Sequence, residues 1–384
     1  MRITRLFTEF FNSEKASGFI LIACTAFSLL VTNSSLGAGY QAFWHIQFAG
    51  HSLTHWINDG LMTIFFLLVG LEIEREIYDG ELKSLRNALL PVLAAAGGML
   101  VPALMHLSLN YGTSTQNGFG IPMATDIAFA LGVLSLAGKK VPGSLKVFLT
   151  ALAIIDDLGA ILIIAFFYTS NLSGTYLFFA ALIFGGLIIL NKLKIHNLWA
   201  YLIPGVFMWY FMLQSGVHAT ISGVLLAFAM PFGDGSQKTV SWKTQHFLHK
   251  PVAFIIIPLF ALANTCIVFS GDFYSGLTET NSLGIIAGLF LGKPIGIVFF
   301  SWLAVKTKLV RLQSGVKWAH IVGAGILGGI GFTMSIFISL LAFPDEDIII
   351  HSKIAILFSS LLAGIIGLIV LKLISKPRNS LRIT

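Results

Sequence analysis

Apolar segments recur from one end of the chain to the other, and they decide what the chain can fold into. A helix needs about 20 predominantly apolar residues to cross the hydrocarbon core of a bilayer. Of the 384 residues, 56% are hydrophobic and only 11% are charged. We therefore predict an all-α membrane protein whose whole chain, 1–384, forms one polytopic domain.

We predict about twelve transmembrane helices, each from an apolar run between polar residues. The predicted spans are Gly18–Thr32, Leu53–Leu71, Ala88–Leu107, Gly120–Leu136, Leu145–Tyr168, Thr175–Leu190, Leu198–Leu213, Val217–Met230, Pro251–Phe269, Ser282–Leu303, Ala319–Phe343 and Ile354–Ile374. The longest polar loop is expected at Gly233–Lys250, and the aromatic-rich Tyr40–His51 is expected to form a short hairpin or an interfacial helix. Cys24 and Cys266 are interpreted as packing residues rather than as a disulfide.

The basic residues fall on one side of this arrangement. Every Lys and Arg except Lys293 and Lys353 lies at a terminus or in every second loop. Cytoplasmic loops carry the excess of Lys and Arg, so this pattern predicts that both termini are cytoplasmic. It also explains the net charge of +7 by contact with a lipid bilayer, without a nucleic acid partner.

Asp156 and Asp157 lie side by side within the apolar run Phe148–Phe167. One carboxylate at that depth costs about 2.5–3.5 kcal/mol on insertion scales, and two neighbours disfavour each other's charged form. Such a cost points to a site that binds a cation, a proton, or each in turn. Adjacent helical residues point about 100° apart. We therefore expect one carboxylate to face an ion cavity while the other reaches Lys293, which also lies at membrane depth. A buried ion pair that only ties helices together is the alternative.

Two predicted spans carry helix-breaking residues in their middles. Pro122 stands just before Thr125 and Asp126, and five glycines fall within Gly323–Gly331. Interrupted segments at matching places in two halves of a chain are typical of a transporter site. The glycines alone would also be compatible with close helix packing. Half-helix ends carry partial charges, which Asp126 and Lys293 are suited to balance.

The residue types at this depth favour a hard cation such as Na⁺ or Li⁺. Carboxylates, the Thr125 hydroxyl and freed backbone carbonyls offer oxygen ligands. A buried carboxyl also holds a proton more readily, so Na⁺ and H⁺ compete for the same oxygens. Competition combined with alternating access gives exchange. Asp59, near the end of a span, is interpreted as a helix cap or as part of a cation funnel.

At these residues the chain resembles the NhaA-type Na⁺/H⁺ antiporters of bacterial inner membranes. The matching blocks run in family order through the chain: Asn58–Glu72, Ala124–Gly132, Phe148–Ala160, Ser215–Thr220, Gly292–Gly296 and Gly329–Ile338. NhaA proteins are themselves an example of inverted repeats with broken helices. The resemblance therefore implies a repeat core at about 88–168 and 282–374, with the fourth and eleventh spans interrupted and crossing.

The resemblance also implies an activity. It implies an electrogenic antiporter, not an enzyme, that expels Na⁺ or Li⁺ and admits more than one proton per ion, for sodium and pH homeostasis. It implies no cofactor, a location in the bacterial inner membrane and a homodimer formed through the Tyr40–His51 region. A Na⁺-coupled symporter of an organic solute on a similar fold is the main alternative. An ion channel and an intramembrane aspartyl protease are weaker ones, since a protease would place its two Asp residues on different helices.

By the same resemblance, Asp157 is the main ion and proton carboxylate. Asp156 is its partner and pairs with Lys293, while Thr125 helps to bind the ion. Asp126 and Lys293 compensate the charges of the half-helices. The exchanged protons are carried by Asp156 and Asp157 together, or by Asp157 and Lys293.

The family is regulated by pH from the cytoplasmic side, which assigns pH-sensing candidates to this chain. They are Glu72, Arg75, Glu76, His246, His249 and, as a packed histidine or a tuner of the pH response, His218. The chain departs from the family at two places, where family members often carry a basic residue at the position of Glu74 and a carboxylate at that of Gln245. We therefore expect an altered pH threshold. A solvated loop face is the alternative interpretation of these residues.

Overall fold

The computed structural model describes residues 5–138, 141–169, 172–233, 239–269, 273–313 and 315–374. The basic residues Arg2, Lys139, Lys140, Lys238 and those of the tail from Lys376 onward lie outside this part of the chain. The predictions that involve them are therefore discussed from the sequence alone.

The described chain is almost entirely helical. Its first half comprises α1 (Arg5–Thr32), α2 (Gly37–Trp44), β1 (Gln47–Phe48), β2 (His51–Ser52), α3 (Leu53–His55), η1 (Trp56–Leu61), α4 (Met62–Asp79), η2 (Glu81–Lys83), α5 (Leu85–Asn110), η3 (Gln116–Met123), α6 (Ile127–Leu136), α7 (Gly143–Phe167) and α8 (Gly174–Lys192). Its second half comprises α9 (Trp199–Ser215), α10 (Ile221–Ala229), α11 (Val240–Pro251), η4 (Val252–Ile256), α12 (Ile257–Asn264), α13 (Phe273–Thr278), α14 (Thr280–Ala287), η5 (Gly288–Gly292), α15 (Lys293–Lys306), α16 (Trp318–Gly328), α17 (Phe332–Ala342) and α18 (Glu346–Ile374). This architecture confirms the all-α membrane class.

Within the described residues, seven helices are long and apolar enough to cross a bilayer. Three pairs bent at a short break raise that number to ten if each pair is one span. The two remaining predicted spans correspond to α9, with 17 residues, and α10, with nine. Both are helical but short, so the count of twelve transmembrane helices stays a prediction.

The predicted polar loop at Gly233–Lys250 is wrong over most of its length. Helix α11 begins at Val240 and continues through η4 and α12 as one span, Val240–Asn264. Its first turns are amphipathic, because the buried residues Ser241, Thr244 and Gln245 lie on one face. The prediction missed this start of the span because it was based on long apolar runs, and a polar helix that packs by one face contains none.

The segment Tyr40–His51 contains the end of a helix followed by a hairpin, which confirms the predicted hairpin. Helix α2 ends at Trp44, and the strands β1 and β2 then pair antiparallel, with Phe48 opposite His51. Cys24 and Cys266 are both free, as predicted.

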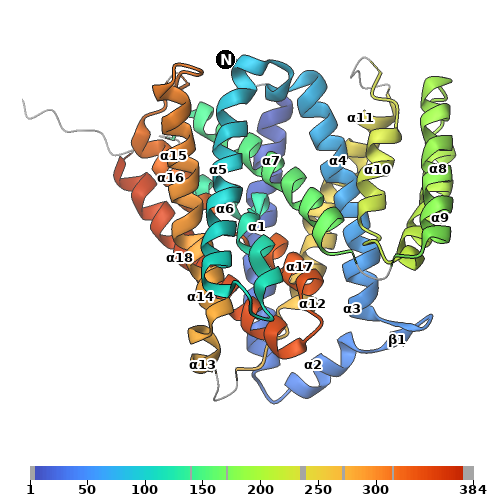
Figure 1. The fold of residues 1–384 in the computed structure, drawn as a ribbon, viewed down its shortest axis with the longest axis horizontal. Helices are drawn as coiled ribbons and strands as arrows, with labels where there is room; N and C mark the ends of the chain where they lie inside the picture. The colour runs from blue at the N-terminus through green and yellow to red at the C-terminus, as the bar shows by residue number, and fades with distance from the viewer. Residues whose placement is uncertain are drawn as a thin grey trace, which may run out of the picture.

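The connections lie at two ends of the helical bundle (Figure 1). The connection from α4 to α5 and that from α15 to α16 lie at the same end as the start of α1, at the top of the view. Helix α2 and strand β1 lie at the opposite end. This arrangement separates predicted cytoplasmic loops from predicted external ones.

Helices α5 and α15 approach each other more closely than ordinary side chains allow. A Cβ atom added to Gly97 would lie 2.4 Å from the Gly296 carbonyl oxygen, and one added to Gly296 would lie 2.0 Å from that of Gly97. Both glycines are therefore needed for backbone contact. Because Lys293 is three residues before Gly296, this contact holds the start of α15 inside the bundle.

Candidate functional site at two helix breaks

Two membrane-spanning segments are interrupted inside the protein. Helix η3 ends at Met123 and α6 begins at Ile127, with a bend of 42°. Helix α16 ends at Gly328 and α17 begins at Phe332, with a bend of 45°. The breaks fall beside Pro122 and in the glycine cluster, where the sequence predicted interruptions.

The two breaks are hydrogen-bonded to each other. The Asp126 backbone N–H donates to the Ile330 carbonyl at 2.7 Å. The Thr125 hydroxyl lies 2.8 Å from the Gly328 carbonyl, and the Ser335 hydroxyl donates to the Ile121 carbonyl at 2.7 Å. Backbone groups at each break thus find partners on the opposite segment, as burial in a membrane requires.

The Asp126 carboxylate caps the N-termini of two helices. One oxygen accepts from the Phe129 N–H of α6 at 2.9 Å. The other accepts from the Thr333 N–H of α17 at 3.0 Å and from the Thr333 hydroxyl at 2.5 Å. Each helix N-terminus carries about half a positive charge, so one carboxylate balances two helix ends.

Lys293 points into the same region from α15. Its ammonium contacts one oxygen of Asp156 and donates to the Thr125 hydroxyl at 2.9 Å. Lys293, Asp156 and Thr125 are completely buried. The Thr125 oxygen also lies 2.7 Å from the same Asp156 oxygen. Since this hydroxyl has a single proton, it can donate either to Asp156 or to the Gly328 carbonyl.

Asp157 lies next to this pair and is 3% exposed. Within the described part of the chain, one buried oxygen of Asp157 and one of Asp156 have no hydrogen-bond partner. Leaving a buried polar group unsatisfied costs about 1–3 kcal/mol, and more for a charge. Two adjacent carboxylates with unsatisfied oxygens therefore form a donor set that suits a hard cation or a proton. Thr125, Asp126, Asp156, Asp157 and Lys293 are called the buried cluster below.

Asp59 lies on the π-helical turn η1, apart from the buried cluster. Its carboxylate lies 3.2 Å from His55 Nδ1, on the preceding helical turn. Its backbone carbonyl accepts from the Thr63 hydroxyl and from Trp209 Nε1. His55 was not singled out from the sequence, although its spacing of four residues from Asp59 is that of helical neighbours.

The pH-sensing candidates are only partly brought together. His249 Nδ1 of α11 lies 3.9 Å from a carboxylate oxygen of Glu72 on α4, and Arg75 pairs with Glu76 at 3.1 Å. His246 is exposed and its ring stacks on Trp242.

His218 lies in the connection between α9 and α10, where its Nε2 is 2.8 Å from the Tyr168 carbonyl. The two departures from the family pattern are both buried: Gln245 on α11, and Glu74 on α4, which has one oxygen without a partner among the described residues.

Thr333 and the carbonyls of Gly328 and Ile330 were not predicted as site groups. They lie in the block Gly329–Ile338 or directly before it. The sequence therefore indicated that this segment belongs to the site, but it did not predict these contacts. The hydrogen-bond partners are about 200 positions away in the chain.

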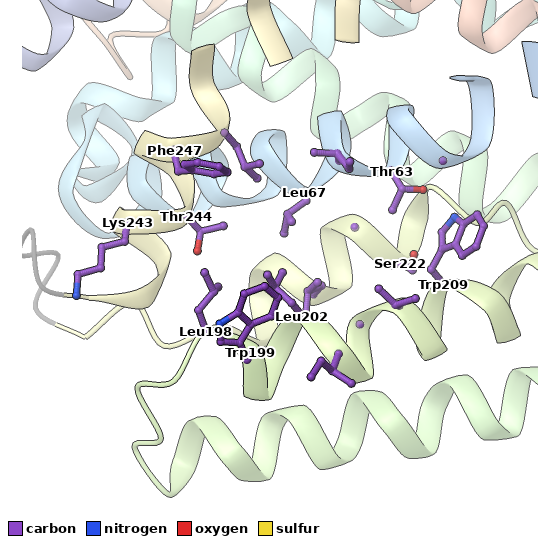
Figure 2. A pocket seen from close by; sticks show the side chains of 18 of the residues that line it. Thr63, Leu67, Leu198, Trp199, Leu202, Trp209, Ser222, Lys243, Thr244 and Phe247 are labelled. Atoms are coloured by element: carbon purple, nitrogen blue, oxygen red, sulfur yellow. The ribbon is translucent and has the colours of Figure 1, made fainter. Parts of the chain in front are cut away.

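A separate apolar groove of about 880 Å³ lies between α4, α9, α10 and α11. Lys243 marks one end and Trp209 the other, with Leu67, Trp199 and Leu202 among the side chains between them (Figure 2). No member of the buried cluster lines this groove.

Apolar helices, two of them broken around buried charges, define a helical secondary transporter of the membrane. The comparison with known families identifies which one. The chain matches the family described as Na⁺/H⁺ antiporter 1 over residues 8–371, and it belongs to that family. It is therefore a transporter rather than an enzyme, and the family does not favour the solute symporter.

Its relatives cover nearly the whole chain. The chain is 61% identical over 374 residues to Na(+)/H(+) antiporter NhaA 1 of Flavobacterium johnsoniae, covering 97% of this chain and 98% of the relative. It is 56% identical over 384 residues to Na(+)/H(+) antiporter NhaA of Cytophaga hutchinsonii, covering 100% and 99%. It is 47% identical over 369 residues to the NhaA of Vibrio cholerae, covering 95% and 97%. These similarities mark the chain as a bacterial membrane protein of the NhaA type.

Proposed function

We propose that this chain exchanges cytoplasmic Na⁺ or Li⁺ for external protons across the bacterial inner membrane. One observation carries the proposal: two adjacent buried carboxylates, Asp156 and Asp157, each keep an unsatisfied oxygen beside two helix breaks. The names of the relatives support the same pair of ions.

The cation would be bound by oxygen atoms of Asp157, Asp156 and Thr125. The Thr125 oxygen now accepts a hydrogen bond from Lys293, and a bound cation would use that lone pair. The positive charge of Na⁺ would also replace the ammonium as counter-charge for Asp156. Cation binding and the Lys293–Asp156 pair would then compete, because both draw on the charge of Asp156 and on the Thr125 oxygen.

Protons and Na⁺ would compete at these carboxylates. A proton on Asp157 neutralises its carboxylate as a bound cation does, so the site is occupied by one or the other. If two groups release protons for each Na⁺ bound, the exchange moves net charge and is electrogenic. The two groups would be Asp156 and Asp157, or Asp157 and Lys293.

Asp126 and Lys293 would compensate the charges of the interrupted helices. The capping of α6 and α17 by Asp126 supports this role. We further propose that the broken segments cross as the fourth and eleventh of twelve spans. They would belong to inverted repeats at about 88–168 and 282–374 within a single domain.

Regulation by pH would involve the contact between α4 and α11. The proximity of His249 to Glu72 supports this proposal, with Arg75, Glu76, His246 and His218 as further candidates. Buried Glu74 and Gln245 would move the pH threshold away from that of relatives with other residues there. Asp59, with its neighbour His55, would attract cations at the external entrance.

We also propose a homodimer formed through the Tyr40–His51 region, with both termini in the cytoplasm and no cofactor. The β1–β2 hairpin that extends from the end of the bundle supports such a contact (Figure 1). The distribution of basic residues supports the orientation.

Proton movement in everted membrane vesicles tests the proposed exchange. Vesicles are acidified inside by respiration, and NaCl or LiCl is then added between pH 6.5 and 9. Wild type should collapse the pH gradient, whereas Asp157→Asn should not, because an amide offers neither a charge nor a titratable group. Exposed Asp347→Asn is the matched control and should behave as wild type.

Two results would contradict the proposal. Near-normal exchange by Asp157→Asn would overturn the site assignment. No response of wild type to either cation at any pH would overturn the exchange itself. Na⁺-dependent uptake of an organic solute would then become the activity to measure.

A further inference from the structure

Lys293 follows directly on a π-helical turn, η5, within an otherwise regular helical segment. The Lys293 N–H donates to the Gly288 carbonyl, five residues back, instead of to Leu289. The next residue is Pro294, which has no N–H to donate. The Leu289 carbonyl therefore receives neither of the helical hydrogen bonds that residues four and five positions later would supply.

This released carbonyl lies against the break between α16 and α17. A Cβ atom added to Gly329 would lie 2.3 Å from the Leu289 oxygen. Gly329 has φ −71° and ψ −3°, a conformation open to any residue. Glycine is needed there for space alone, and the close approach lets its Cα–H groups contact the carbonyl oxygen.

The first interrupted segment holds the other side of the same turn. A Cβ atom added to Gly288 would lie 2.6 Å from the Pro122 ring, just before the break at 124–126. One added to Gly292 would lie 2.8 Å from Pro102 of α5. The turn that precedes Lys293 is thus in contact with both interrupted segments.

We propose that the Leu289 carbonyl, seated on Gly329, sets the position of the Lys293 ammonium against Asp156 and Thr125. Gly329 and Pro294 are then positioning residues of the buried cluster. A π turn shifts the rotation of all residues that follow it. Since the Gly97–Gly296 contact anchors α15, the turn fixes the direction in which Lys293 points. This inference rests on the proposed exchange activity.

Gly329→Ala tests the contact, because it adds a methyl group where the Leu289 oxygen lies without straining the backbone. We expect the displaced turn to weaken the placement of Lys293. The pH profile of exchange should shift, and the apparent KM for Na⁺ should change by about tenfold, as for the loss of one charge-assisted hydrogen bond. Gly364→Ala on α18 is the matched control, because its Cβ would meet neighbours only at 3.7 Å or more.

Pro294→Ala gives a second test that does not depend on Gly329→Ala folding. It restores an N–H that can donate to the Leu289 carbonyl and so draw it away from Gly329. We expect a shift of the pH profile in the same direction. In the double variant, Gly329→Ala with Pro294→Ala, the pH profile should shift no further than in the single variant with the larger shift, because both changes act through the Leu289 carbonyl.

Thermal unfolding of the purified protein gives a readout that is independent of transport. Gly329→Ala should lower the unfolding temperature less in a Lys293→Gln background than in wild type. Equal lowering in both backgrounds would show that Gly329 acts only in packing.

Wild-type pH profiles of exchange in both Gly329→Ala and Pro294→Ala would overturn the inference. An inactive wild type would contradict the proposed exchange instead, while the unfolding cycle would still decide the role of Gly329.

Discussion

Asp126 and Thr333 are joined by two hydrogen bonds, although 207 positions separate them in the chain. Asp126 is the N-cap residue of α6. Through these bonds it also accepts from the first turn of α17. The two interrupted segments therefore share one carboxylate, and a change at either residue acts on both helix ends.

Thr333→Val should destabilise the protein by about 1.5–3 kcal/mol, the usual value for a hydrogen bond to a charged group. The substitution keeps the shape and the backbone N–H but leaves the Asp126 carboxylate with one donor fewer. The midpoint of thermal unfolding in detergent measures the effect. Thr265→Val is the control, because within the described part of the chain the buried Thr265 hydroxyl bonds only to a carbonyl of its own helix. Equal effects of the two substitutions would contradict a shared cap.

Lys293→Ala should destabilise the protein far more than Lys372→Ala. Removing one partner of a buried ion pair typically costs about 3–5 kcal/mol, because the other charge stays buried. Lys293 is fully buried beside Asp156, whereas Lys372 is exposed on the last turn of α18. Unfolding temperatures of both variants test the difference. Adding Asp156→Asn to Lys293→Ala should recover part of the loss, and a further loss would argue against the pair.

The apparent KM for Na⁺ should rise as the cytoplasmic pH falls, with little change in the maximum rate. If one proton competes with Na⁺ at the carboxylates, the rise approaches about tenfold per pH unit on the acid side. Initial rates of exchange at a series of Na⁺ concentrations and pH values measure it. A constant KM with a falling maximum rate would mean that protons act elsewhere than at the ion site.

Glu72→Gln should shift the pH of half-maximal exchange without reducing the maximum rate. The Glu72 carboxyl group lies 3.9 Å from His249 Nδ1 where α4 meets α11, and an amide of the same size can no longer gain or lose a proton there. The pH of half-maximal exchange in everted vesicles reports the change. His246→Ala should have a smaller effect, because His246 is exposed and stacked on Trp242. An unchanged profile in Glu72→Gln would dismiss this contact as a regulator.

Features set by local composition could be predicted from the sequence. The run around Asp156 and Asp157 lies on one helix, α7, and the breaks occur beside Pro122 and in the Gly323–Gly331 cluster. Apolar length, proline and glycine act within a few residues of themselves, so they need no knowledge of the fold. The start of α11 was missed because its buried face is polar.

Contacts between distant segments were decided only by the tertiary structure. From helix geometry alone, either Asp156 or Asp157 was free to face Lys293, and only the family resemblance pointed to Asp156. The packing of α7 against its neighbours brings Asp156 to Lys293. The same holds for Thr333 at Asp126 and for the Leu289 carbonyl at Gly329. The physical reason is that such contacts depend on how helices are rotated and paired. The whole bundle sets that rotation and pairing, and no single segment encodes them.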